Sequence, residues 1–394
     1  MTNKVFIASA CRTAIGSFQG MFANTSAVDL GVSAVREALN RAGLEGREKE
    51  VDEVNLGCIY QAAQGQGVAR QITIHAGIPD TTPAVTSNIL CGSGLFSVLQ
   101  AVRAIRSGDC QIIVAGGTEN MTKAPYLLQK GREGYRMGHA EIYDHMIYDG
   151  LTDAFNNYHM GMTAENLADK YEISREEQDR FAVESQNKAE QAQINGLFEE
   201  EIVSVLVKKR RQEIVCDTDE YIRKGATFEG MQKLRAAFKK DGSVTAGNAS
   251  GINDGAAALV IVSEQKLGEL DVTPLAEIVG WGVSGCEPSI MGIGPVQAVR
   301  NALKVSGSNI DDLHLIEANE AFAAQSIAVN KELGWDTDKV NVNGGAIALG
   351  HPVGASGARI LVTLLHQMKR ASKTEGLATL CVGGGMGVAL QVRR

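Results

Sequence analysis

The chain of 394 residues contains an ordered series of short segments twice, and this repeat restricts the possible folds more than any other feature. The matching pairs are 32–39 with 296–303, 51–56 with 310–315, 91–94 with 354–357, and 112–117 with 379–384. The offset between partners stays between 259 and 267. Four ordered matches at a nearly fixed offset predict a duplicated unit, and the mixture of helical and strand-like patterns makes that unit α/β.

The third matching pair, 91–94 with 354–357, contains a cysteine just before a predicted helix. Cys91-Gly-Ser-Gly precedes apolar residues at helical spacing that run to Gly108. Because a helix N-terminus favours an anion, we expect the Cys91 thiol to ionise more readily than a free cysteine. The alternative is a small buried thiol packed at a tight turn.

The segment 121–250 has no counterpart in the second half of the chain. It is rich in charge, methionine and tyrosine, and Ser174 and Glu177 form the capping box of a helix that stops near Gly196. We interpret it as an insertion that lies over the two repeated units, as a lid that holds substrate, as a source of oligomer contacts, or as both.

Composition excludes several classes of protein. Hydrophobic residues make up 44% and prolines number only 7, which suits a compact enzyme, and a net charge of −8 disfavours nucleic acid. The densest basic run, 208–211, is predicted to be a solvated strand end or turn. Residues 1–16 indicate a first β-strand and not a signal peptide, and no apolar run approaches eighteen residues, so we expect a soluble, cytoplasmic protein. The seven cysteines lack zinc-site spacing, so no metal is predicted.

Three motifs in the second half concern Cys91: 317–323, and the glycine-rich segments 343–357 and 381–387. His351 stands in a glycine-rich loop that leads into a helix, and Cys381 ends an apolar strand. If the halves are related by a pseudo-two-fold axis, the duplication brings Cys91, His351 and Cys381 to one place. The alternative for His351 alone is a structural histidine with satisfied hydrogen bonds.

The whole chain resembles the thiolase family, and within it the short-chain biosynthetic type. The resemblance rests on "NILCGSG" (88–94), "YHMGMTAENLA" (158–168), "TAGNASGINDGAAA" (245–258), "NEAFA" (319–323), "GGAIALGHPVGASGARI" (344–360) and "LCVGGGMG" (380–387). It implies a duplicated thiolase fold, two βαβαβαββ halves in five α-β-α-β-α layers. The implied parts are an N-terminal half, 1–120 completed by 251–270, an inserted loop domain, 121–250, and a C-terminal half, 271–394.

The resemblance also implies a reaction, the reversible Claisen condensation of two acetyl-CoA to acetoacetyl-CoA and CoA. Cys91 is then the nucleophile that carries the acyl group, His351 its base, and Cys381 the second acid/base, for which we expect a pKa near 8. Asn319 holds a water that faces the enolate oxygen, and the N–H groups of Cys91 and Gly383 form the oxyanion hole.

For coenzyme A, the chain offers neither a P-loop nor a complete dinucleotide fingerprint. By resemblance, residues of the insertion and its neighbourhood bind it instead: Arg223 near the adenine nucleotide, Ser250 at the pantetheine, and Leu151, Ala246, Ala249 and Phe322 along the channel. His159 and Met160 resemble the pair of the short-chain type, with Met160 limiting the space beside the acyl group. CoA thioesters are thus expected as substrates, with no permanently bound cofactor.

Several alternatives remain open at this stage. A decarboxylating ketoacyl synthase would use a second histidine where this chain has Cys381. A 3-ketoacyl-CoA thiolase of broader chain length and a non-catalytic thiolase-like protein are the other candidates. A reversible disulfide between Cys91 and Cys381 is a further hypothesis. The expected assembly, inferred from the family, is a homotetramer that contains a tight dimer.

Overall fold

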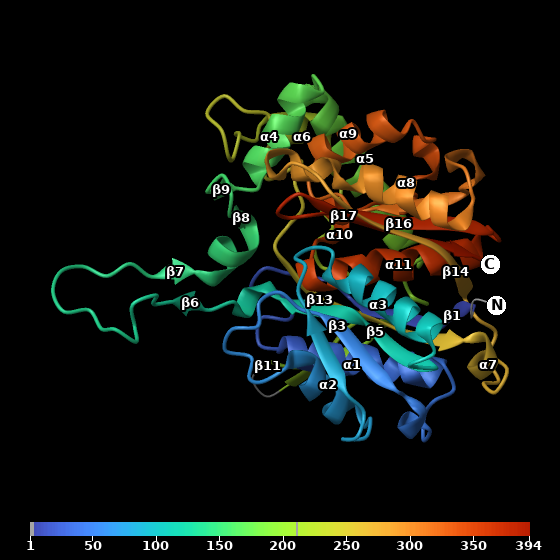
Figure 1. The fold of residues 1–394 in the computed structure, drawn as a ribbon. Coiled ribbons are helices and arrows are strands. Elements are labelled where there is room, and N and C mark those ends of the chain that lie inside the picture. Colours follow the sequence, from blue (N-terminus) through green and yellow to red (C-terminus); the bar gives the residue numbers. More distant parts are fainter. Residues whose placement is uncertain (1–3, 210–211) are drawn as a thin grey trace.

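A computed structural model describes residues 4–209 and 212–394 (Figure 1). Its centre is an eleven-stranded sheet whose main path runs β15-β16-β17-β14-β1-β13-β5-β3-β4, with β2 and β10 attached beside it. The strands of the path are β15 (Leu315–Ala318), β16 (Glu375–Val382), β17 (Met386–Arg393), β14 (Ala276–Gly285), β1 (Val5–Thr13), β13 (Asn253–Ser263), β5 (Ile112–Asn120), β3 (Glu53–Gly57) and β4 (Ala84–Ser87). β1 confirms the predicted first strand.

The sheet consists of two similar halves, as the repeat predicts. The order β3-β5-β13-β1 in one half matches β15-β16-β17-β14 in the other, and in each the first pair is parallel and the others are antiparallel. The halves meet where β1 pairs with β14 at Phe6↔Glu277 and Ile7↔Ala276. β14 also pairs with β17 on its other side, with Glu277 opposite Arg393.

Helices complete five layers (Figure 1). α1 (Ala27–Arg41) and α2 (Val68–Ala76) cover the outer face of the first half-sheet, and α8 (Gly294–Ser306) covers the second. α3 (Ser93–Ser107) and α11 (Val353–Arg370) pack against each other between the half-sheets. In α11, 15 of 18 residues are buried, against 8 of 15 in α1, which is the difference expected between a central and an outer helix.

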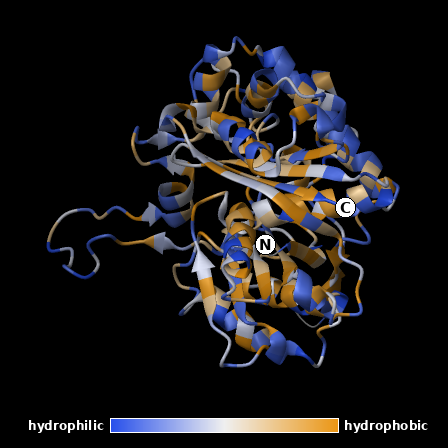
Figure 2. Cartoon of the chain, turned by 45° about the vertical axis from the view of Figure 1, so that its right-hand side comes forward, coloured by the Kyte–Doolittle hydropathy of each residue, from blue (hydrophilic) through white to orange (hydrophobic). Residues whose placement is uncertain are grey.

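Glycines permit the close contact of the central layer. A Cβ on Gly117 would lie 2.1 Å from the carbonyl oxygen of Gly354, and one on Gly94 would lie 2.8 Å from the Ala358 nitrogen. The N-terminal ends of α3 and α11 therefore approach at backbone contact. Figure 2 shows hydrophobic residues concentrated on the strands and inner helices, and hydrophilic residues on the outer helices.

Local signals in the sequence are confirmed. α3 ends at Gly108, whose φ of 88° is the left-handed conformation of a helix C-cap. α5 (Arg175–Ile194) begins at Ser174 with the predicted capping box to Glu177. The turn after it contains Gly196 at φ 67°.

The segment 121–250 is more deeply anchored than an overlying insertion would be. β10 (Ile202–Val203) pairs in parallel with β1, so this segment contributes a strand to the central sheet. Buried Arg12 of β1 contacts Glu201 at 2.6 Å and Asp219 at 2.7 Å. In contrast, the chain between β6 (Tyr126–Leu127) and β7 (Tyr143–Asp144) projects away from the body (Figure 1).

The remaining elements are short connectors and parts of the insertion. They are β2 (Gly16–Ser17), η1 (Glu48–Glu50), η2 (Met121–Lys123), η3 (Met146–Leu151), β8 (Thr152–Asp153), β9 (Tyr158–His159), α4 (Gly161–Lys170), β11 (Val205–Lys209), β12 (Gln212–Cys216), α6 (Phe228–Gln232), α7 (Glu264–Leu267), η4 (Pro288–Ile293), η5 (Ile310–Asp312), α9 (Ala323–Leu333), η6 (Thr337–Lys339) and α10 (Ala346–Leu349). Of the basic run 208–211, Arg210 and Arg211 lie outside the described residues.

Membrane-spanning helices and clustered metal ligands are both absent from residues 4–209 and 212–394. No helix in these ranges has the length and apolar character needed to cross a membrane. Nor do these residues contain a group of three or more His, Cys, Asp or Glu side chains placed to hold a metal ion.

Candidate active site

Cys91 lies in the sharp turn between β4 and α3. Leu90 just before it has φ 54°, a left-handed conformation that side chains other than glycine rarely adopt. The Ser93 hydroxyl stabilises this turn, since it accepts from the Ile89 N–H at 3.0 Å and donates to the Leu90 carbonyl at 2.6 Å. A strained turn held by its own serine presents Cys91 at the start of the helix.

The expected easy ionisation of Cys91 is wrong. The side chain is only 5% exposed, and burial raises its pKa to about 11, although the N–H groups of Gly383 and of Cys91 itself act to lower it. A helix N-terminus typically contributes about 0.3–1 kcal/mol, less than the 1.36 kcal/mol of a single pKa unit. Burial therefore prevails, and the thiol needs a base to become a nucleophile.

His351 is the candidate base for the Cys91 thiol. Its backbone N–H donates to Asn253 Oδ1 at 2.9 Å, and its Nδ1 lies 2.6 Å from Ser356 Oγ. Because the Ser356 hydroxyl donates its one proton to the Pro352 carbonyl at 2.9 Å, it accepts from Nδ1–H, which leaves the lone pair on Nε2. Burial, followed by the positive charge of Arg359, lowers the pKa of His351 to about 3, so the ring is neutral and able to accept a proton.

Asn319 lies beside that lone pair. Its Nδ2 is 3.5 Å from His351 Nε2, at the end of β15, and its backbone N–H donates to the Thr379 carbonyl at 3.0 Å. The side chain is 1% exposed, and its Oδ1 has no hydrogen-bond partner among the described residues. Asn319 thus keeps an acceptor available for a ligand or a water, as the prediction for this residue requires.

Cys381 and Gly383 lie at the end of β16. Cys381 is fully buried, and burial, with the neighbouring Cys91, raises its pKa well above the ordinary value. The expected pKa near 8 is therefore wrong for the protein without substrate, and Cys381 carries its proton. A Cβ on Gly383 would lie 2.7 Å from Leu90 Cδ1 and 3.1 Å from Met160 Sδ, so this glycine sits directly against the nucleophile turn.

A largely apolar cavity of about 350 Å³ opens onto Cys91 and His351. All eight residues predicted to bind coenzyme A line it: Leu151, His159, Met160, Arg223, Ala246, Ala249, Ser250 and Phe322. Cys381, Asn319 and Gly383 do not line the cavity. The structure therefore brings the predicted binding residues together around the nucleophile and the base, with the other catalytic candidates behind them.

Met160 and His159 line the cavity beside the nucleophile turn. Met160 is 5% exposed and packs against Gly383, and the His159 ring stacks on Phe238 at 4.5 Å between centroids. His159 Nδ1 accepts from the Gly161 N–H at 3.0 Å, and burial lowers the pKa of the His159 ring. These contacts fix Met160 beside the position of an acyl group on Cys91.

The outer end carries the polar groups suited to a nucleotide. Arg223 Nη2 lies 3.4 Å from the Tyr221 hydroxyl and 3.3 Å from the Ala246 carbonyl. The Ser250 backbone N–H donates to the Ala321 carbonyl at 3.0 Å, and Ala249 forms a bridge with Phe322, which ties the insertion to the 319–323 motif.

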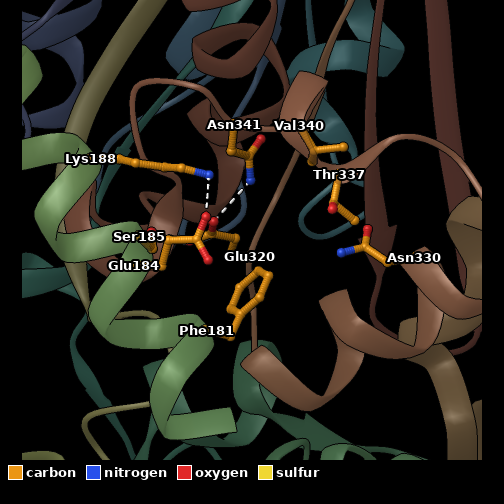
Figure 3. Close-up of a pocket in the computed structure, with 9 residues that line it drawn as sticks. All are labelled: Phe181, Glu184, Ser185, Lys188, Glu320, Asn330, Thr337, Val340 and Asn341. Carbon is orange, nitrogen blue, oxygen red and sulfur yellow. Dashed lines mark hydrogen bonds and ion pairs between the residues drawn. The ribbon is translucent and has the colours of Figure 1, made fainter. Parts of the chain in front are cut away.

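A second cavity, of about 160 Å³, lies behind the 319–323 motif (Figure 3). Glu320, the residue after Asn319, turns its carboxylate toward Asn341 there, while Lys188 pairs with Glu184 at 2.7 Å. The lining of this cavity includes neither Cys91 nor His351. We assign it no part in the chemistry.

The residues that support the catalytic candidates were not predicted from the sequence. Ser356, which holds the His351 ring, was visible in the repeat, because it occupies the position that Ser93 occupies in the first half. Glu317 and Arg359 lie within recognised motifs, yet they meet only in the folded chain, with Glu317 Oε2 3.8 Å from Arg359 Nη1. No local pattern in the sequence predicts such a pair.

Comparisons with known proteins agree over the full length. The family model described as "Thiolase, N-terminal domain" matches residues 5–265, and the one described as "Thiolase, C-terminal domain" matches residues 272–394.

Among curated relatives, acetyl-CoA acetyltransferases from Chromobacterium violaceum and Pseudomonas aeruginosa are each 56% identical. The first alignment covers 99% of this chain and 100% of the relative, and the second covers 99% of each. The solved structure of acetyl-CoA acetyltransferase from Bacillus anthracis superposes with a TM-score of 0.97 at 46% identity, covering 100% of this chain and 99% of that one.

Proposed function

The chain belongs to the thiolase family, and we propose that it is an acetyl-CoA C-acetyltransferase, which converts two acetyl-CoA to acetoacetyl-CoA and CoA, and back. One observation carries the assignment of residues: Cys91 and the free Nε2 of His351 share one apolar cavity, and Asn319 lies 3.5 Å from that nitrogen. Relatives with this name at 51–56% identity over the full length support the reaction.

The first half of the reaction transfers an acetyl group to Cys91. His351 Nε2 takes the thiol proton, the Cys91 sulfur attacks the thioester carbon, and the departing CoA sulfur takes the proton back from His351. The N–H groups of Cys91 and Gly383 receive the charge of the tetrahedral oxygen. The N–H of Gly383 already acts on the Cys91 sulfur, which supports its place in this oxyanion hole.

The second half joins or cleaves a carbon–carbon bond. In synthesis, Cys381 first loses its thiol proton to solvent, and the thiolate then removes a proton from the α-carbon of the second acetyl-CoA. The carbanion attacks the acetyl carbon of acetyl-Cys91, and the Cys91 sulfur leaves as a thiolate that takes the proton from Cys381. In thiolysis, Cys381 returns that proton to the leaving enolate. The raised pKa of Cys381 supports the second role directly, because the buried thiol starts out protonated. The enolate oxygen faces His351 and a water held by Asn319, and in thiolysis His351 Nε2 donates to it the proton that it has taken from Cys91.

Coenzyme A occupies the cavity with its nucleotide at Arg223 and its pantetheine at Ser250. Met160, which lines the cavity and packs against Gly383, supports a preference for acetoacetyl-CoA over long 3-ketoacyl-CoAs. All proposed steps use protein side chains and CoA thioesters.

We also propose a homotetramer containing a tight dimer, acting in the cytoplasm. The projecting chain between β6 and β7 exposes Tyr126 by 65%, Ile142 by 62% and Met137 by 97%. Apolar side chains this exposed on a projecting segment are typical of an interaction surface. β4 ends the strand order and is open to pairing with a second copy. The seven cysteines, all free thiols among the described residues, support a reducing compartment.

The domain division proposed for this activity is an N-terminal half of 1–120 completed by 251–270, an inserted loop domain of 121–250, and a C-terminal half of 271–394. The position of β13 between β1 and β5 supports assigning 251–270 to the first half.

The test is loss of the acetoacetyl-CoA enolate absorbance on addition of CoA and purified protein. Rapid loss, with an acetyl group found on Cys91 by mass spectrometry, is the expected result. No loss with a folded protein that binds CoA would reject the proposal in favour of longer 3-ketoacyl substrates or a non-catalytic role.

A further inference from the structure

A buried pair of Arg359 and Glu317, behind the site, has few hydrogen bonds. Arg359 on α11 and Glu317 on β15 are 1% and 2% exposed, and their closest charged atoms are 3.8 Å apart. Among the described residues, Nε, Nη1 and Nη2 of Arg359 and Oε2 of Glu317 have no hydrogen-bond partner. Burial raises the pKa of Glu317 to about 8 in spite of the positive charge of Arg359, so the pair carries a desolvation penalty that the usual hydrogen bonds do not offset.

Neighbouring charges show that the fold can satisfy such groups. Buried Arg12 donates to Glu201 at 2.6 Å and to both oxygens of Asp219 at 2.7 and 2.9 Å. Glu320 accepts from Ser185 Oγ at 2.7 Å, from Asn341 Nδ2 at 2.9 Å and from the Ile347 N–H at 3.1 Å (Figure 3). An unsatisfied pair beside satisfied ones indicates a functional constraint at that position.

The position of the pair suggests what the constraint is. Arg359 follows Ser356 by one helical turn, and Ser356 holds the His351 ring. Glu317 lies in β15, two residues before Asn319, which directly follows the end of this strand. The pair thus connects the helix that orients His351 to the strand that carries Asn319.

The positive charge of Arg359 is the second way in which the pair acts on His351. The buried titratable groups on the elements around His351 include Cys91 (nucleophile turn), Glu119 (β5), Asp254 (β13), Glu317 and Glu320 (β15 and its end), Arg359 (α11) and Cys381 (β16). Of these, Arg359 joins burial in lowering the pKa of His351. The charges of Arg12, Glu201 and Asp219 also act on Arg359. Its guanidinium is not neutralised by close hydrogen bonds, so its field extends to its surroundings.

We propose that Arg359, paired with Glu317, is a positioning residue for the Asn319–His351 pair. This inference rests on the proposed function. It assigns Arg359 two effects on one ring: its placement against Asn319, and a contribution, second to that of burial, to the low pKa of the ring. Neither Arg359 nor Glu317 touches substrate.

The test compares Arg359→Met with Arg359→Lys, which retains the charge, and with Arg370→Met. Arg370 lies at the exposed end of the same helix and serves as the matched control. Glu317→Gln is the second route to the pair if Arg359→Met does not fold. Each folded variant is assayed for thiolysis of acetoacetyl-CoA from about pH 2.5 to 9, and its histidine ring resonances are titrated by NMR over the same range, with His351→Asn for assignment.

In Arg359→Met we expect kcat to fall about 10- to 100-fold, as for other residues that orient a catalytic group, with KM nearly unchanged. The acid-side fall of kcat and the titration of the His351 ring should both move to higher pH by about one unit. Arg359→Lys should restore the wild-type titration, and Arg370→Met should match wild type in both. Glu317→Gln should lower kcat while leaving the acid side in place, since the positive charge remains.

Unchanged kcat and titration in folded Arg359→Met would overturn the proposal, as would a lower kcat with an unmoved His351 titration, which would assign Arg359 to packing alone. If Arg359→Met does not fold, wild-type kcat in Glu317→Gln or a shifted His351 titration in Arg359→Lys would overturn it. The NMR titration does not require activity. A wild type without thiolysis would therefore reject the proposed function while leaving this charge effect separately measurable.

Discussion

The turns that precede α3 and α11 are equivalent in the two halves of the chain, but they carry different catalytic groups. In the first, Ser93 binds the backbone of its own turn, to Ile89 and Leu90, and the adjacent residue is Cys91. In the second, Ser356 binds backbone at Pro352 with its proton and the His351 ring with its lone pair. The same serine thus shapes a nucleophile turn in one half and orients a base in the other.

This difference explains how a duplicated fold becomes one asymmetric site. Backbone contact between α3 and α11 at Gly94, and between β5 and α11 at Gly117, makes the spacing of the two turns nearly invariant. Only the side chains presented there then need to differ. The following predictions test how far the two turns have separated in role.

The largest effect is expected for Cys91→Ala in the first turn. Removing the only atom that can carry the acetyl group should lower kcat for thiolysis by more than about 10⁴-fold. Thermal unfolding should change little, since a small side chain replaces a small one. Enolate absorbance measures the rate, and residual turnover near wild type would move the nucleophile elsewhere.

Asn319→Ala should follow, with a loss of about 10²- to 10³-fold in kcat. The substitution removes a donor that faces His351 and an acceptor open to a bound water, both needed only when negative charge develops. Steady-state rates in both directions measure it, and circular dichroism confirms folding. Normal turnover would exclude the residue from enolate stabilisation.

The paired serines give the sharpest comparison. Ser356→Ala should lower kcat about 10- to 100-fold, because the His351 ring loses the partner that fixes its tautomer. Ser93→Ala should instead lower the free energy of unfolding by about 1–2 kcal/mol through the unpaired Ile89 N–H, with a smaller effect on kcat. Denaturant titration and rate assays separate the two. Equal kinetic losses would mean that both turns position chemistry in the same way.

The pH dependence of Cys91 alkylation tests its raised pKa. Since the thiolate reacts and the thiol pKa is about 11, the iodoacetamide rate should rise about tenfold per pH unit from pH 7 to 10 without a plateau. Acetyl-CoA should protect the thiol. His351→Ala, which removes the neighbouring ring, is the control, and a plateau below pH 9 would show that the helix terminus outweighs burial.

The smallest effect is expected at the inner wall of the cavity. Met160→Ala should raise kcat/KM for a six-carbon 3-ketoacyl-CoA several-fold, because it opens space beside Gly383 at little loss of other contacts. Activity on acetoacetyl-CoA should fall less than tenfold. Parallel thiolysis assays measure both, and no change in preference would place the length limit elsewhere.

Prediction from sequence succeeded where the signal is local or repeated. The duplication, the helix to Gly108 and the capping box at Ser174 are patterns along the chain, and each is present in the structure. The repeat also placed Cys91 and His351 correctly in one site. The eight cavity residues came from the resemblance, since no periodicity distinguishes Ser250 or Phe322.

Prediction failed where the outcome depends on what surrounds a group. The helix terminus at Cys91 is visible in sequence, but the burial that raises its pKa is a property of distant segments. The pairing of β10 with β1 was missed because two residues carry no strand signal. Arg359 and Glu317 were missed for the same reason as any long-range pair.

β14 has β1 on one side and β17 on the other, with Glu277 opposite both Phe6 and Arg393. The first and last strands therefore lie about 10 Å apart, two strand spacings, across a single residue. A short peptide could join them, and the exposed connection near Asp271 between the halves could be opened in exchange. The order of the halves along the polypeptide is thus a matter of ancestry, and a circularly permuted gene with the histidine half first would encode the same active site.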